Sequence, residues 1–108
     1  MGIDGYTCYR TVEETYDTGA SIMANYPQLA DWIKIGESWE KINGDDGNSA
    51  IPAGYDIFAL KLTNKCTSGD KPKFFLSCSI HAREYSPAEL CTRFAEMLVE
   101  GYGNDAGK

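Results

Sequence analysis

Apolar side chains recur every three or four residues near the start of the chain, which is the spacing of a helix that buries one face. Thr11 and Glu14 precede this stripe as a capping box, in which each side chain accepts a hydrogen bond from the other residue's backbone N–H. Pro27 disfavours helical dihedral angles at the residue before it. We therefore expect a first helix from Val12 to Asn25.

A second apolar stripe of helical spacing lies near the end of the chain. Ser86 and Glu89 form another capping box there, and Pro87 stands at the first helical position, where its missing N–H is not needed. Gly101 and Gly103, just after Glu100, favour an end to the helix. We expect the second helix to begin after Ser86 and to run to about Glu100.

Three stretches between the helices have the composition of strands. Trp32 to Glu40 and Tyr55 to Thr63 are joined by a loop without a helix, so they should pair antiparallel if they are neighbours. The loop, residues 41–53, is rich in the Gly, Pro, Asn and Asp residues that turns select. Lys73 to Ile80 is almost continuously apolar, as in a strand buried on both faces. The predicted order is helix, strand, strand, strand, helix, an α/β arrangement.

Length and charge narrow the choice of function. The chain has 108 residues, which fits a single domain and excludes a second independent core. Its formal net charge of −6 argues against nucleic acid or an anionic membrane as a partner. No apolar run approaches the roughly 20 residues of a membrane span. The first ten residues have neither the basic flank nor the apolar stretch of a signal peptide, so we expect none in this chain.

The four cysteines are widely spaced and include no CxxC pair, which leaves a zinc-knuckle interpretation unsupported. Cys78 lies in the third predicted strand and Cys91 on the apolar stripe of the second helix, so we expect both to be small buried apolar side chains. Cys8 and Cys66 have polar surroundings, and they could pair in an oxidising compartment.

His81, the sole histidine, stands at the exit of the third predicted strand and just before a helix, where α/β proteins place ligands. Glu84 follows in the same turn, and a neutral imidazole and a carboxylate are both zinc ligands. Arg83, between the two, can bind a carboxylate with two parallel hydrogen bonds. The His-x-x-Glu spacing by itself is more often that of a hydrogen-bonded surface pair without a catalytic role, whereas the strand exit, the capped helix and Arg83 favour a site.

Several short motifs, taken in order, resemble the zinc carboxypeptidases of the carboxypeptidase A/B family. The resemblance extends from about Tyr9 to Asp105. Its segments are Thr11-Val12-Glu13-Glu14 with Tyr16, Tyr26-Pro27-Gln28-Leu29, Ile35-Gly36-Glu37-Ser38 with Trp39-Glu40, Gly54 with Ile57, Leu60 and Lys61, His81-Ala82-Arg83-Glu84, and Glu100-Gly101-Tyr102-Gly103.

The resemblance implies a role for each residue of the turn. His81 and Glu84 would be two of three zinc ligands, and Arg83 would help to bind the substrate near the scissile bond. The implied reaction is hydrolysis of the C-terminal peptide bond of a peptide or protein by a metal-activated water. The implied location of the parent protein is secreted or extracellular.

The resemblance also implies that this chain is incomplete. The family's third zinc ligand is a histidine much further along the chain, and its general-base glutamate lies downstream as well, so we expect no catalytic residue within residues 1–108. We interpret the chain as one domain, the N-terminal portion of a mixed-sheet α/β/α carboxypeptidase-like fold with residues 41–53 as a surface insertion. We expect it to be inactive alone, to bind zinc weakly, and to self-associate through the exposed sheet edge of its third strand.

Two other functions fit the same residues. In a non-catalytic binding module, His81 and Glu84 would be structural and the acidic surface would recruit a partner. In a zinc amidohydrolase of the aspartoacylase or desuccinylase type, the metal site would be the same and the amide substrate different. Arg83 between the two ligands and the match over the first helix favour the carboxypeptidase.

Overall fold

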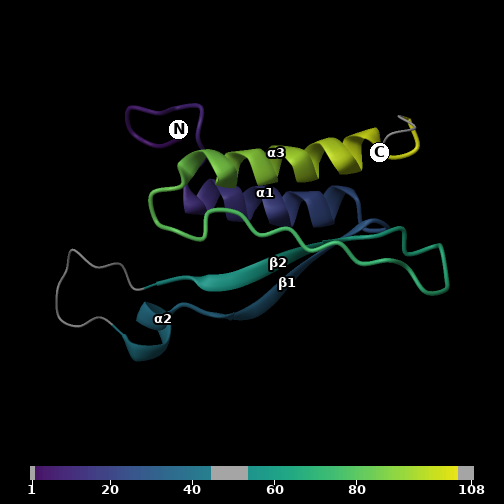
Figure 1. Cartoon of the computed structure of the whole chain (residues 1–108), viewed down its shortest axis with the longest axis horizontal. Helices are drawn as coiled ribbons and strands as arrows, with labels where there is room; N and C mark the ends of the chain where they lie inside the picture. The colour runs from purple at the N-terminus through teal and green to yellow at the C-terminus, as the bar shows by residue number, and fades with distance from the viewer. Residues whose placement is uncertain (1, 45–53, 105–108) are drawn as a thin grey trace.

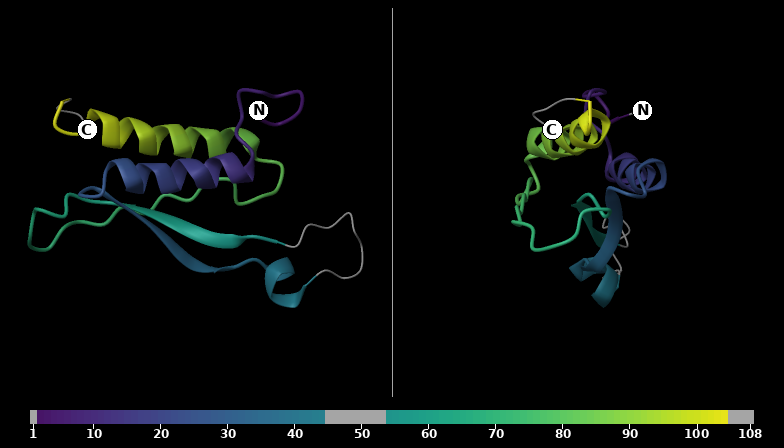
Figure 2. Two further views of the ribbon diagram at one scale, coloured as in Figure 1. Left: turned by 180° about the vertical axis from the view of Figure 1, so that it is seen from behind. Right: turned by 90° about the vertical axis from the view of Figure 1, so that its right-hand side faces the viewer.

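The two long helices lie side by side on one side of a small sheet (Figures 1 and 2). The computed structural model describes residues 2–44 and 54–104. Helix α1 is Val12–Asn25 and helix α3 is Tyr85–Gly101. Because α1 contacts both α3 and the first strand of the sheet, it is the element that holds the two layers together.

The sheet has two antiparallel strands, β1 (Ala30–Glu37) and β2 (Asp56–Leu62), and the short helix α2 (Trp39–Asn43) follows β1. The register runs from Ala30 opposite Leu62 to Glu37 opposite Asp56. The antiparallel pairing of the first two strands is therefore confirmed. The first strand ends three residues earlier than predicted because Ser38 caps α2: its hydroxyl accepts a hydrogen bond from the N–H of Lys41.

The predicted first helix is confirmed at both ends. The Thr11 hydroxyl accepts the N–H of Glu14 at 3.1 Å, and the Glu14 carboxylate accepts the N–H of Thr11 at 3.5 Å, which completes the predicted capping box. The core beneath this helix is small. Its buried members are Ile22, Ala30 and Val99, one each from α1, β1 and α3.

The capping box predicted for the second helix is wrong. Helix α3 begins at Tyr85, and its N-cap residue, Glu84, makes no side-chain capping bond. The hydroxyl of Ser86 instead shares a 2.8 Å hydrogen bond with the Tyr9 hydroxyl, and the carboxylate of Glu89 accepts the N–H of Arg10 at 3.0 Å. Both side chains that could have capped the helix bind the N-terminal segment, a contact that the local sequence does not encode.

Glu89 and Arg10 are the centre of a clamp between the N-terminal segment and α3. Glu89 is 8% exposed, and its carboxylate lies 3.4 Å from the Arg10 guanidinium and 3.2 Å from that of Arg93. Arg10 also binds Glu96 at 2.7 Å. Since a buried carboxylate is stable only when it is paired, this clamp fixes where the chain enters α1.

The third predicted strand is wrong. The stretch from Lys73 to Ile80 has no regular secondary structure, and Phe74 and Phe75 are 84% and 88% exposed. A strand needs a neighbour to satisfy its backbone groups, and within residues 2–44 and 54–104 only β1 and β2 pair as strands. The observed order is helix, strand, helix, strand, helix. The α/β class is correct, and the three-stranded sheet is not.

The predicted loop is also shorter than expected at its start, because residues 41–43 belong to α2. The remainder of the proposed insertion, residues 45–53, lies outside the described residues. No helix among the residues that the structure describes is long and apolar enough to cross a membrane.

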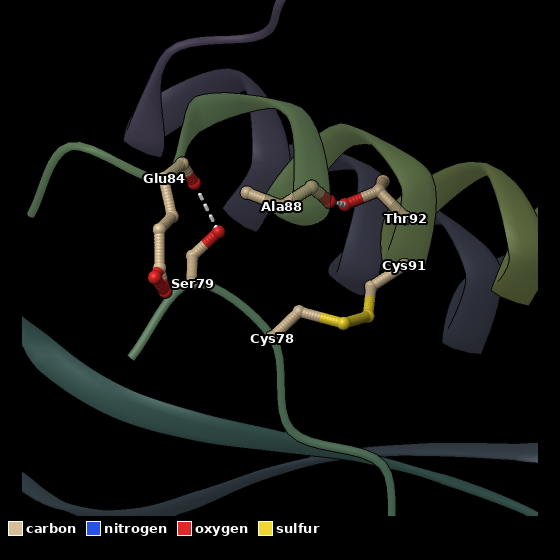
Figure 3. Close-up of a disulfide and its surroundings, with 6 residues drawn as sticks. All are labelled: Cys78, Ser79, Glu84, Ala88, Cys91 and Thr92. Atoms are coloured by element: carbon tan, nitrogen blue, oxygen red, sulfur yellow. Dashed lines mark hydrogen bonds between the residues drawn. A yellow bond between two sulfur atoms is a disulfide. The ribbon is translucent and has the colours of Figure 1, made fainter. Parts of the chain in front are cut away.

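Both cysteine expectations are wrong. Cys78 and Cys91 form a disulfide with their Cα atoms 6.5 Å apart, whereas Cys8 and Cys66 are exposed and unpaired. The Cα separation lies within the usual range for a disulfide. Cys91 points from α3 toward the segment that carries Cys78 (Figure 3), and this packing brings together two thiols that the sequence pattern assigned to the core.

Candidate functional site

The predicted site is a tight turn between the irregular segment and α3. The N–H of Glu84 binds the carbonyl of His81 at 3.1 Å, and the N–H of Tyr85 binds that of Arg83 at 3.2 Å. These two bonds close the turn immediately before the helix begins. The turn is at the surface, with the His81 side chain 75% exposed and that of Glu84 31% exposed.

His81 and Glu84 lie face to face. His81 Nδ1 is 2.9 Å from Glu84 Oε2, and the backbone N–H of His81 donates to Oε1 at 3.2 Å. A carboxylate can only accept, so Nδ1 carries the hydrogen in this contact. Both Glu84 oxygens are thus directed at the same residue.

Arg83 is exposed between the two, and its guanidinium makes no ion pair with the residues in the described ranges. It remains available for a ligand at the surface beside the His81–Glu84 pair. Tyr85, the first residue of α3, is half-exposed next to Glu84.

Two contacts that the sequence did not predict attach the segment before the turn to the start of α3 (Figure 3). The Ser79 hydroxyl donates a hydrogen bond to the backbone carbonyl of Glu84. Its neighbour Cys78 is covalently joined to Cys91 on α3. Ser79 also has φ +57°, the one non-glycine residue in the described chain with a left-handed backbone. The even number of cysteines was the available signal for the disulfide, and no local signal existed for the hydrogen bond.

The donor atoms of the turn suit zinc in kind but are too few. Imidazole nitrogen and carboxylate oxygen are both normal zinc ligands, and here they face one another on an accessible turn. A catalytic zinc site has three protein ligands, and among the described residues no cluster of three or more His, Cys, Asp and Glu side chains could hold a metal. The turn can therefore supply two ligands of such a site.

Sequence comparison defines the class of protein to which this turn belongs. The sequence profile of the zinc carboxypeptidases matches residues 15–107, which include the whole turn and both long helices apart from the first residues of α1. The chain belongs to the zinc carboxypeptidase family, and the resemblance found in the sequence motifs is confirmed.

Individual relatives agree. The chain is 32% identical to carboxypeptidase A1 of Sus scrofa over 93% of its length, and 31% identical to carboxypeptidase A1 of Homo sapiens over 94%. It is 26% identical over 94% of its length to a zinc carboxypeptidase of Saccharothrix mutabilis subsp. capreolus. The chain spans only about a fifth of the length of these relatives. No solved structure matches it significantly.

Proposed function

We propose that this chain is the zinc-binding N-terminal portion of a carboxypeptidase catalytic domain, which removes C-terminal residues from peptides or proteins only together with residues beyond the 108 of this chain. The observation that carries the proposal is the 2.9 Å contact between His81 Nδ1 and Glu84 Oε2 on an accessible turn, within a chain of the zinc carboxypeptidase family. The share of each relative that the chain covers, about a fifth, supports the incomplete domain.

In this proposal each residue of the turn has one task. His81 would hold zinc through Nδ1, with its one ring hydrogen on Nε2, and Glu84 would hold it through its carboxylate. Zinc, when bound, polarises the peptide carbonyl as a Lewis acid. Arg83 binds the substrate chain beside the metal, where a planar guanidinium can hold a carbonyl or carboxylate oxygen. The third ligand and the general base come from outside residues 1–108.

The disulfide bears on the location of the parent protein. Disulfides persist in oxidising environments and are rare in the cytosol. The Cys78–Cys91 bond therefore supports our proposal that the parent protein is extracellular. The family match and the position of Arg83 favour a peptidase over the amidohydrolase alternative, and no feature of the described surface specifically supports a non-catalytic binding module.

Calorimetric titration with zinc tests the two-ligand site. We expect weak binding to the 108-residue chain, because two ligands leave the ion poorly held, and we expect His81→Ala and Glu84→Gln each to abolish it. Glu40→Gln, which removes a half-buried carboxylate from α2, outside the turn, is the matched control and should leave binding unchanged. Binding that survives His81→Ala would contradict the ligand assignment, and tight 1:1 binding by a single chain would contradict an incomplete site.

A further inference from the structure

Ser79 lies at the point where the irregular segment meets the start of α3. Its φ of +57° is in the left-handed region, which residues other than glycine adopt only rarely. Such a conformation persists where surrounding contacts maintain it, and it is more common at functional sites than elsewhere. Two contacts surround it here, one on each side of the residue.

The first contact is the hydrogen bond from the Ser79 hydroxyl to the backbone carbonyl of Glu84. Glu84 is the N-cap residue of α3, and no side-chain capping bond fixes its position. The Glu84 carboxylate is used instead on His81, through the backbone N–H and through Nδ1. The Ser79 hydroxyl is therefore the side-chain group that fixes the backbone from which the Glu84 ligand projects.

The second contact is the Cys78–Cys91 disulfide (Figure 3). It joins the residue before Ser79 to the second turn of α3, so both ends of the segment from Cys78 to Glu84 are attached to the same helix. One attachment is the disulfide, and the other is the peptide chain as it enters α3 at Tyr85. A segment closed in this way has little freedom to carry Glu84 away from His81.

We propose that Ser79 is a positioning residue, which together with the Cys78–Cys91 disulfide holds Glu84 opposite His81 in the arrangement that binds zinc. The zinc part of this inference rests on the proposed function. Ser79 does not contact the metal or the substrate, and it acts through the backbone of Glu84. Deleting its hydroxyl should loosen the turn without unfolding α3, because the helix is also attached to the N-terminal segment through Glu89.

The decisive variant is Ser79→Gly, because it removes the hydroxyl together with Cβ, and glycine adopts the left-handed backbone without strain. The Glu84 amide, which binds the His81 carbonyl, reports the turn by hydrogen exchange. In Ser79→Gly we expect exchange of this amide to accelerate about two- to tenfold, the range that corresponds to the loss of one neutral hydrogen bond. We expect zinc to bind more weakly by a similar factor, as measured by the shift of the NMR signals of the His81 ring during a zinc titration. Thr92→Ala is the matched control, since it deletes a hydroxyl that donates to the Ala88 carbonyl on the same helix, away from the turn.

The disulfide is tested by a second pair of variants. Cys78→Ser/Cys91→Ser should accelerate Glu84 exchange and weaken zinc binding at least as much as Ser79→Gly does. Cys8→Ser/Cys66→Ser removes two exposed, unpaired thiols and should change neither.

The outcomes separate the two proposals. If Ser79→Gly leaves both Glu84 exchange and zinc binding as they are in the unchanged chain, the positioning role is overturned. It is also overturned if Thr92→Ala changes the two quantities as much as Ser79→Gly does, because that would indicate a general loss of stability. Weaker zinc binding without faster Glu84 exchange would also overturn it. If exchange accelerates as expected but the unchanged chain binds no zinc, the positioning role stands and the zinc part of the proposed function fails.

Discussion

Gly19 is the position at which one added methyl group should disturb the packing of the whole chain. It is buried in the middle of α1 and faces the indole of Trp32 on β1. A Cβ atom at Gly19 would lie 2.5, 2.6 and 2.7 Å from the Trp32 ring atoms Cζ3, Cε3 and Cη2. Such distances are well inside van der Waals contact, so either the helix or the ring must move.

Two opposing effects set the magnitude for Gly19→Ala. Alanine is better than glycine in a helix interior by about 1 kcal/mol, whereas overpacking a filled core costs about 1 to 3 kcal/mol. Trp32 cannot turn aside freely, because it stacks on Phe58 at 4.7 Å and meets the edge of Tyr16 at 5.7 Å. Moving the ring also sacrifices part of these aromatic contacts, which contribute about 0.5 to 1.5 kcal/mol each. We expect a net loss of roughly 1 to 2 kcal/mol in the free energy of unfolding.

Urea unfolding measures this difference through the shift in midpoint at constant slope. Gly36→Ala is the control, because a Cβ at Gly36 meets no atom within 4 Å, and its effect should stay within about 0.5 kcal/mol. Combining Gly19→Ala with Trp32→Leu should cost less than the sum of the two single changes, because the smaller side chain makes room. If Gly19→Ala instead stabilises the chain by about 1 kcal/mol, as at an exposed helix position, the packing explanation is refuted.

Three further predictions concern the Asp56 carboxylate, the clamp around Glu89 and an exposed pair of phenylalanines. Hydrogen bonds from the ammonium groups of Lys41 and then Lys34 lower the pKa of Asp56. Its ionised carboxylate therefore stabilises the fold fully at a pH above the ordinary aspartate pKa, and this contribution is lost as the pH falls through the lowered pKa. When the free energy of unfolding is measured against pH, Asp56→Asn should reduce its fall over that acid range. Glu89→Gln should destabilise the chain by about 2 kcal/mol in urea, because it removes the buried carboxylate charge that binds both Arg10 and Arg93, and no change would contradict the clamp. Exposed Phe74 and Phe75 should cause concentration-dependent self-association in sedimentation, which Phe74→Ser/Phe75→Ser should weaken; a monomer at high concentration would contradict this.

The sequence was sufficient wherever a structure depends on near neighbours in the chain. The capping box of Thr11 and Glu14 defined α1 correctly, because both partners lie within one turn. The His81–Glu84 turn was likewise predictable, since three residues of separation already place the two side chains together. The antiparallel strand pair was predicted from a connection expected to contain no helix, and the one helix found in its described part, α2, is too short for a crossover.

Predictions from the sequence were wrong where a residue's partners lie far away in the chain. Ser86 and Glu89 have the spacing of a capping box, yet Tyr9 and Arg10 bind them instead. The apolar run from Lys73 to Ile80 has the composition of a buried strand, yet composition provides no neighbour to pair with.

By itself, then, the sequence determined the two long helices, the strand pair and the family, and it singled out His81 and Glu84, whose side chains meet in the turn. Each of these depends on local spacing or on motifs that occur in a fixed order. Only the tertiary structure decided that Cys78 bonds Cys91, that Ser79 holds the backbone of Glu84, and that Arg10 is clamped to α3. These contacts join groups whose meeting depends on how α3 packs against the rest of the chain, and no short-range pattern encodes that packing.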